Sequence, residues 1–243
     1  EASRVVVQTR DDLALAKAKI LNQMGDYDAA LQALAGHAFV ACEGGEHAIV
    51  EQHQFAHLAL GRAAMAAKLW ETGLGHFRAA QVIPDALGAG FWNIAMAVPP
   101  AYFEAVCLME LGPVAEAKVI FRRHIEMPTD SFSTMYLPAL PYFVGQSLMR
   151  LGMREDGLLR FNGLLATARA ELSRDDHGFF KATPFFISYQ DEPRRERTRH
   201  YGYLAALAHI GLDNLNEARQ MLNIVLAAFP NDQWAMLELS ILP

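Results

Sequence analysis

The stretch YFVGQSLMRLGMREDGLLRF, residues 142–161, decides the fold, because an earlier stretch repeats its skeleton forty residues upstream. The repeated residues are Tyr102-Phe103, Leu108-Met109, Leu111-Gly112 and Phe121, which return as Tyr142-Phe143, Leu148-Met149, Leu151-Gly152 and Phe161. Each copy has apolar residues at helical spacing, a glycine that ends one helix, and a second helix that folds back. A fixed period of this size predicts a stack of helical hairpins.

Outward from this stretch, the remaining chain divides into further hairpins at glycines and prolines. The predicted units are residues 11–36, 46–84, 99–128, 139–172 and 194–230, followed by a capping helix over 232–242. We expect all of residues 1–243 to form a single all-α domain. The links between units are long, and the longest, residues 173–193, is unusually aromatic. The segment from Ile83 to Pro100 contains several prolines and glycines, so we expect an ordered connection there.

Composition excludes several classes of partner. The chain has 243 residues, 52% of them hydrophobic and 20% charged, as in folded globular proteins. Its net charge is −6 and most basic residues are scattered, which argues against nucleic-acid binding. No apolar run approaches the roughly 20 residues that span a bilayer, so we expect no membrane partner.

The cysteines and the first residue carry expectations about context. Cys42 and Cys107 stand in unlike surroundings, a loop and an apolar helix, which indicates two reduced thiols and a cytoplasmic location. The chain starts at Glu1 instead of methionine, so we expect a processed chain or a piece of a longer protein.

The second helices share a pattern of small and large residues. Ala30, Gly73, Ala117, Gly157 and Ala218 are each followed one turn later by Leu34, Phe77, Phe121, Phe161 and Leu222. With Leu60-Gly61 in a first helix and prolines near the ends of second helices, this pattern resembles the tetratricopeptide repeat over most of the chain. The resemblance implies a right-handed α-α superhelix of about five hairpins. Units longer than the family's 34 residues imply inserted loops.

A narrower resemblance concerns the Cys42–His47 segment, the VIPDALGAG stretch, the aromatic insertion and the RDDL start. Together they look like the C-terminal repeat tail of large bacterial proteins. In those proteins a domain of unknown function, related to carbohydrate-active β-sandwiches, precedes the repeats. This resemblance implies that the chemistry of the longer protein lies outside this chain.

The resemblance also implies a concave groove, lined by first helices, that binds extended peptides. By alignment, the inner-wall residues are Leu58, Arg62, Tyr102, Met109, Tyr142, Gln146, Arg150, His200 and Tyr203. The three tyrosines at equivalent places suit partner contacts, since each can pack and also form a hydrogen bond. The alternative is that the tyrosines pack between neighbouring units.

Other polar clusters have structural explanations that we favour. His53 and His57, with Glu46, His47 and Glu51 nearby, have a spacing that suits a metal, but His57 takes the place of a large packing residue. The EGGE loop is more typical of a turn than of an acid/base pair. Arg194, Arg195, Arg197 and Arg199 indicate a solvated helix start or a docking site for an acidic group, beside Phe179, Phe180, Phe185, Phe186 and Tyr189.

The sequence therefore predicts a non-enzymatic interaction or docking module, with no catalytic residue, cofactor or metal. Its partner is a protein or peptide, or another domain of the same chain. The alternatives are an accessory domain that supports a carbohydrate-active catalytic domain in the same polypeptide, and an independent metal- or small-ligand-binding helical protein. The terminal helix can cap the stack or pair with a second copy, so the oligomeric state stays open.

Overall fold

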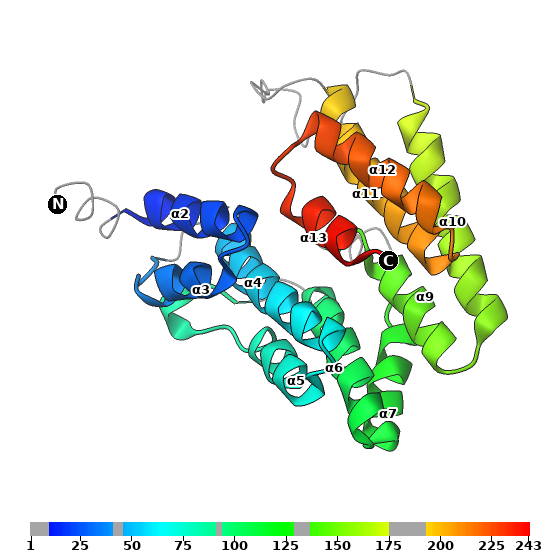
Figure 1. The fold of residues 1–243 in the computed structure, drawn as a ribbon, viewed down its shortest axis with the longest axis horizontal. Helices are drawn as coiled ribbons and strands as arrows, with labels where there is room; N and C mark the ends of the chain where they lie inside the picture. Colours follow the sequence, from blue (N-terminus) through cyan, green and yellow to red (C-terminus); the bar gives the residue numbers. More distant parts are fainter. Residues whose placement is uncertain (1–9, 41–45, 91–93, 129–136, 175–192) are drawn as a thin grey trace. The chain divides into compact units, whose positions relative to one another are not determined.

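The computed structural model describes residues 10–40, 46–90, 94–128, 137–174 and 193–243. Every regular element in these ranges is a helix, and the helices follow one another as antiparallel hairpins (Figure 1). The pairs are α2 (Asp11–Gln23) with α3 (Tyr27–Ala35), α4 (Glu46–Ala66) with α5 (Trp70–Ala79), α6 (Val98–Leu111) with α7 (Val114–Ile125), α9 (Leu140–Arg150) with α10 (Arg154–Leu172), and α11 (Pro193–Gly211) with α12 (Leu215–Ala228). The helix α13 (Gln233–Ile241) follows, which confirms the predicted all-α array of five hairpins and a terminal helix.

The chain forms two compact units, residues 1–143 and 144–243. The first contains three hairpins and the start of α9, and two short 3₁₀ turns, η1 (Asp85–Leu87) and η2 (Ile94–Ala97), interrupt the connection before α6. The second contains the rest of α9 and helices α10 to α13. The single domain over 1–243 and the right-handed superhelix stay predictions.

One packing pattern recurs in all five hairpins. Each of the two helices has a buried small residue, and one turn later the second helix presents a large side chain that is at most 1% exposed. The residues of the three positions are Ala18, Ala30 and Leu34; Gly61, Gly73 and Phe77; Ala105, Ala117 and Phe121; Gly145, Gly157 and Phe161; Ala206, Ala218 and Leu222. A Cβ at Gly73 would lie 3.2 Å from the carbonyl oxygen of Gly61, so these two helix backbones are in close contact.

The turn inside each hairpin also repeats. One residue of each turn is in the left-handed region: Gly25, Lys68, Gly112, Gly152 and Asp213 have φ of 80°, 59°, 113°, 82° and 62°. In four turns the next N–H donates to a carbonyl five residues back, as from Leu69 to Ala64 (2.9 Å). In the third turn the next residue is Pro113, which has no N–H, and Gly112 N–H donates to Leu108 instead (3.1 Å).

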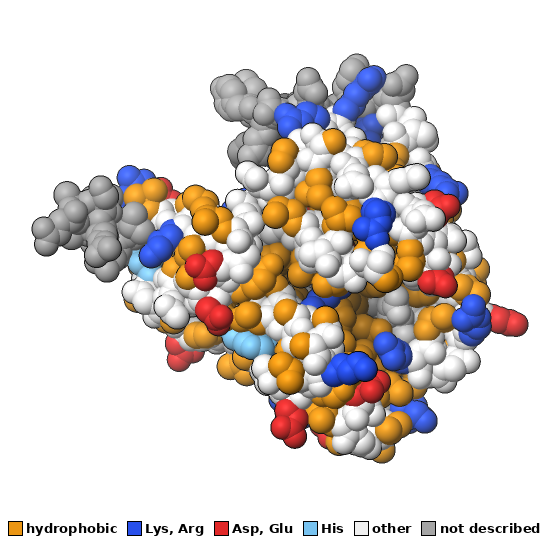
Figure 2. Space-filling view, in the orientation of Figure 1, with side chains coloured by type: hydrophobic (Ala, Val, Ile, Leu, Met, Phe, Trp, Pro, Cys, Tyr) orange, Lys and Arg blue, Asp and Glu red, His pale blue; other side chains and the backbone are white. Residues whose placement is uncertain are grey.

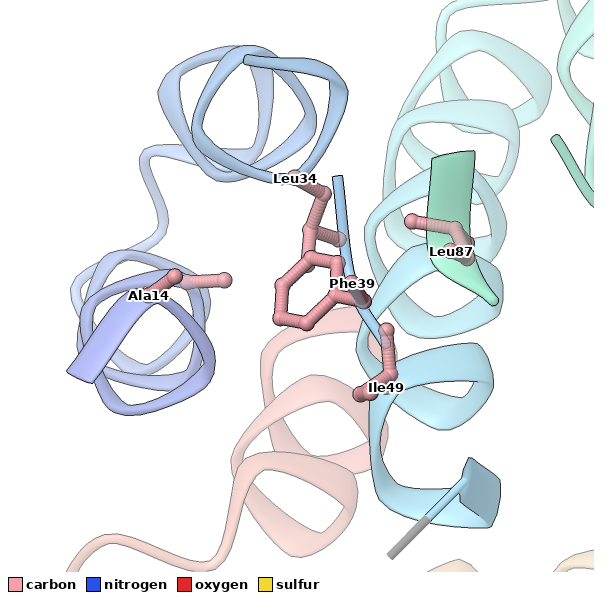
Figure 3. Packing of buried hydrophobic residues seen from close by; sticks show 6 residues of the cluster. Ala14, Leu34, Phe39, Ile49 and Leu87 are labelled. Carbon is pink, nitrogen blue, oxygen red and sulfur yellow. The ribbon is translucent and has the colours of Figure 1, made fainter. Parts of the chain in front are cut away.

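A hydrophobic cluster in the first unit anchors the segment after α3. Figure 3 shows Phe39 between the side chains of Ala14, Leu34, Ile49 and Leu87. The Phe39 N–H donates to Ala86 O (2.8 Å). This segment follows neither helical nor strand periodicity, and its position is set by contacts with residues far along the chain.

The same segment is tied to the start of α2 by a carboxylate. Asp11 Oδ1 lies 2.6 Å from Nε2 of the buried His37, and Asp11 Oδ2 accepts from Val40 N–H (3.0 Å). These bonds hold the pKa of Asp11 below its ordinary value, the bond from His37 more strongly than that from Val40.

The apolar stretch Ile94–Leu111 corrects one expectation from the sequence. It has 18 residues and a mean hydropathy of 1.4, so by length and composition it could cross a membrane, contrary to the expectation that no run approaches that length. However, 56% of it is buried inside the structure, where α6 packs against α5 and α7. A helix that packs against neighbours on several sides buries much of its circumference, which also accounts for an apolar composition.

In the second unit, α13 covers one end of the last hairpin. Ala235 packs with Ala206, Leu222 and Val225, and the Asp232 carboxylate caps the helix by accepting from Ala235 N–H (2.9 Å). This is the capping position predicted from the sequence.

Candidate functional site

The inner-wall residues differ in how far they reach solvent. Leu58 and Tyr102 are buried, at 3% and 5% exposed. The half-buried residues are Arg62, Met109, Tyr142, Gln146, His200 and Tyr203, and Arg150 is exposed. A partner can contact only side chains that reach solvent. Arg62 in the first unit and Arg150 in the second are therefore better candidates for partner contacts than Leu58 or Tyr102. Whether this set contacts a partner stays a prediction.

Tyr102 is packed against neighbouring helices, which is the alternative to a partner contact. Its ring centroid lies 5.7 Å from those of Phe121 and Phe143, and 5.2 Å from that of Phe103. These contacts join α6, α7 and the start of α9 into one aromatic cluster. Tyr102 therefore packs between neighbouring hairpins of the first unit.

The first unit presents an ordered Arg–aromatic pair on its first helices. The guanidinium carbon of Arg62 on α4 lies 5.0 Å from the ring centroid of Phe103 on α6. Phe103 is only half-buried, and its other contacts include a stacked arrangement with Phe77 at 5.3 Å. Both side chains are thus held in place while part of each faces solvent. Phe103 is not among the inner-wall residues predicted from the sequence, although it belongs to the repeated Tyr-Phe dipeptide.

In the second unit the wall residues have distinct surroundings. Tyr203 packs against the cluster that contains Ala206 and Leu222. The His200 ring contacts Tyr201 edge-on at 4.7 Å. Burial lowers the pKa of His200, and Arg199 lowers it further, while Glu196 partly offsets this. Gln146 and Arg150 stand one turn apart on α9, where Arg150 is the exposed member.

Most of the arginine cluster at the start of α11 binds within the chain. Arg195 donates to Ala228 O at 2.6 Å, and the buried Arg197 donates to Arg174 O at 2.6 Å. Arg199 lies 3.6 Å from Asp232. These contacts tie α11 to the ends of α10 and α12 and to the cap of α13. Arg194, Arg195 and Arg199 are exposed, and Arg199 also lies 3.7 Å from Glu196, as expected of a solvated helix start with internal ion pairs. Only the buried Arg197 departs from that interpretation, and the docking site stays a prediction. The neighbouring aromatic residues, Phe179 to Tyr189, lie outside the described residues.

The predicted pair His53 and His57 lies next to a third histidine, His76, which was not predicted from the sequence. His53 and His57 on α4 have ring centroids 4.7 Å apart, and His57 Nδ1 lies 3.2 Å from Nδ1 of His76 on α5. Burial, followed by the charges of His53 and His76, lowers the pKa of His57 to about 4. In the described part of the chain, no group of three or more His, Cys, Asp or Glu side chains is arranged to hold a metal ion. The Cys42–Gly45 part of the EGGE loop lies outside the described residues.

Cys107 is chemically quiet at neutral pH. It is fully buried on α6, and burial, with smaller contributions from Glu104 and Glu110, raises the pKa of its thiol to about 11. Since the thiolate is the nucleophilic form, this cysteine packs as a small apolar residue.

Charged side chains of both signs lie on the face that Figure 2 shows. Figure 2 shows Lys and Arg side chains scattered among apolar and acidic ones on the face in view, with no continuous basic stripe there.

Comparison with known proteins adds little to this description. No family model matches the chain, and no curated protein matches it. Among solved structures, the crystal structure of YrrB, described as a TPR protein with an unusual peptide-binding site, is similar over 99% of each chain, at 14% sequence identity and a TM-score of 0.33. A similarity this slight supports no inference about function, and the helical-hairpin architecture rests on the packing within the chain itself.

Proposed function

We propose that this chain is a non-enzymatic docking module that binds a protein or an extended peptide on its first helices. The observation that carries the proposal is the Arg62–Phe103 pair, an arginine held 5.0 Å from a half-buried aromatic ring on neighbouring first helices. Arginine and aromatic side chains dominate binding energy at interfaces, and side chains already ordered lose less entropy on binding.

Neighbouring positions on the first helices have different surroundings, which supports the same proposal. The small residues Gly61 and Gly145 serve helix packing, whereas the next residues, Arg62 and Gln146, keep part of their surface in solvent. Arg150, one turn further along α9, is exposed. Positions that stacking does not use are available for recognition.

Three titratable side chains in the interior, Cys107, His57 and His124, are tuned away from catalysis at neutral pH. The pKa of the Cys107 thiol is raised, and the pKa values of His57 and His124 are lowered to about 4 by burial. A general acid or base works best with a pKa near the operating pH, and a nucleophilic thiol needs a lowered one. We place the protein in the cytoplasm, where Cys107 stays reduced.

The test uses charge reversal on the inner wall. Arg62→Glu and Arg150→Glu should each weaken binding of a partner captured by affinity purification and then titrated calorimetrically, by tenfold or more, with the melting temperature unchanged. Arg123→Glu, on the exposed side of second helix α7, is the matched control and should bind normally. Equal affinity for all four proteins would contradict the proposal.

The accessory role beside a carbohydrate-active domain stays a prediction from the narrower resemblance. A longer reading frame with a β-rich region before Glu1 would favour it, and the docking partner would then be a domain of the same polypeptide.

A further inference from the structure

The second hairpin contains a row of three imidazoles between its two helices. His53 is 6% exposed, and its ring lies edge-on to that of His57 at 4.7 Å. His57 in turn meets His76 at 3.2 Å between the two Nδ1 atoms, with ring centroids 5.5 Å apart. The His57–His76 bond joins α4 to α5. Because His57 also contacts His53, a change in the charge of one ring is felt by the other two.

We infer that this row is an acid-sensitive latch: neutral imidazoles hold α5 against α4, and their protonation loosens α5 from α4.

The His57–His76 contact tolerates only one proton between its two nitrogens. A hydrogen bond between Nδ1 atoms needs one ring to donate and the other to accept, and a neutral imidazole can do either. When both rings are imidazolium, two N–H groups face each other at 3.2 Å and two positive charges repel. Acid therefore converts an attraction between α4 and α5 into a repulsion.

No carboxylate in the described part of the chain contributes to the pKa shift of His57. Among the described residues, the charges that act on His57 are those of His53 on α4 and His76 on α5. Glu104 of α6 is engaged by Arg78 (2.9 Å) and Gln81 (2.7 Å). On the other helices packed against α4, Asp28 of α3 and Lys19 of α2 are exposed.

His53 makes the row more sensitive. Its Nδ1 is buried and has no hydrogen-bond partner, so a proton added there would be a buried charge without a counter-ion. Burial alone lowers the pKa of His53. The folded hairpin therefore resists protonation, and acid favours any state in which α5 has moved away and the imidazoles reach water.

Hydrogen–deuterium exchange of the full chain at pH 7 and pH 4.5, corrected for the intrinsic exchange rate, tests the latch. In the wild type, residues 70–79 should lose protection at least tenfold at pH 4.5. The double variant His57→Gln, His76→Gln keeps a neutral hydrogen bond and should keep most of that protection. His47→Gln, exposed on the same helix, is the matched control and should behave as wild type.

Two results would overturn the inference: acid leaves the protection of residues 70–79 unchanged in the wild type, or the double variant loses it to the same extent. If the double variant does not fold, histidine NMR titration of the wild type decides. A His57 that titrates below pH 5.5, in step with loss of α5 protection, supports the latch, and a His57 that titrates at or above pH 6.5 contradicts it.

Discussion

The ring of Phe77 lies directly against the backbone of Gly61: a Cβ at position 61 would come within 2.5 Å of Cε1 of that ring. Gly145 and Phe161 repeat this relationship, also at 2.5 Å, in the fourth hairpin. In both hairpins the large residue of the second helix fills space that the first helix leaves by having no side chain. The glycine and the aromatic ring therefore act as one packing unit.

Gly61→Ala should destabilise the protein by about 1–2 kcal/mol, because overpacking against a ring at 0% exposure outweighs the ~1 kcal/mol gained in helix propensity. Urea denaturation measures the change. Gly75→Ala on α5, where a Cβ would have no neighbour within 4 Å, is the control and should be neutral or stabilising. Similar destabilisation in both variants would show that space at Gly61 is not the cause.

Phe161→Ala should cost about 3–5 kcal/mol in the free energy of unfolding. Its ring is 0% exposed and contacts both Gly145 on α9 and Gly211 on α11, so its removal leaves a cavity that neither glycine can fill. Leu159→Ala on the same helix, at 71% exposed, should change stability by no more than about 0.5 kcal/mol. A comparable loss at Leu159 would contradict the assignment of the core face of α10.

Lys68→Gly should stabilise the protein by about 0.5–1 kcal/mol, because Lys68 has φ of 59°, a conformation that costs a residue with a Cβ. The reverse change at the equivalent turn, Gly152→Ala at φ of 82°, should destabilise by about 1 kcal/mol. Thermal unfolding of both variants checks the pair. If the melting temperatures of both variants shifted in the same direction, the left-handed turn conformation would not be the cause of the stability changes.

His124→Gln should reduce the loss of stability in acid. His124 is 4% exposed, and burial lowers its pKa from 6.5 to about 4. The folded state thus binds fewer protons than the unfolded state, so this contribution is complete above pH 6.5 and is lost as pH falls toward 4. The wild type should lose up to about 3 kcal/mol more than the variant over this window, measured by urea denaturation at each pH. If the free energy of unfolding of wild type and variant fell equally with pH, His124 would not be buried in its neutral form.

The sequence predicted the hairpins well because their packing pattern is local. Small and large residues one turn apart, with a glycine or polar residue at the turn, specify a hairpin without reference to distant parts of the chain. Lys68 and Asp213 show the limit, since they occupy the left-handed turn position where the other hairpins have glycine. Tertiary packing imposes that conformation despite its cost.

The candidate site was harder to predict because it depends on contacts between different helices, within one hairpin or between hairpins. Tyr102 and Tyr142 look equivalent in the sequence, but Tyr102 is packed among Phe103, Phe121 and Phe143. His76 stands far from His57 in the sequence, and only the folding of α5 against α4 brings them together. Likewise, Arg62 contacts Phe103 because two first helices lie side by side, and the sequence pattern of a single helix does not predict that contact.

Hydrogen–deuterium exchange of the chain with and without its captured partner tests the docking account most directly. We expect added protection on the first helices, residues 58–66 of α4 and 102–111 of α6 in the first unit, with α5 and α7 unchanged. Arg62→Glu should abolish that protection, whereas Arg123→Glu should preserve it. Protection confined to second helices, or protection that survives Arg62→Glu undiminished, would contradict the account.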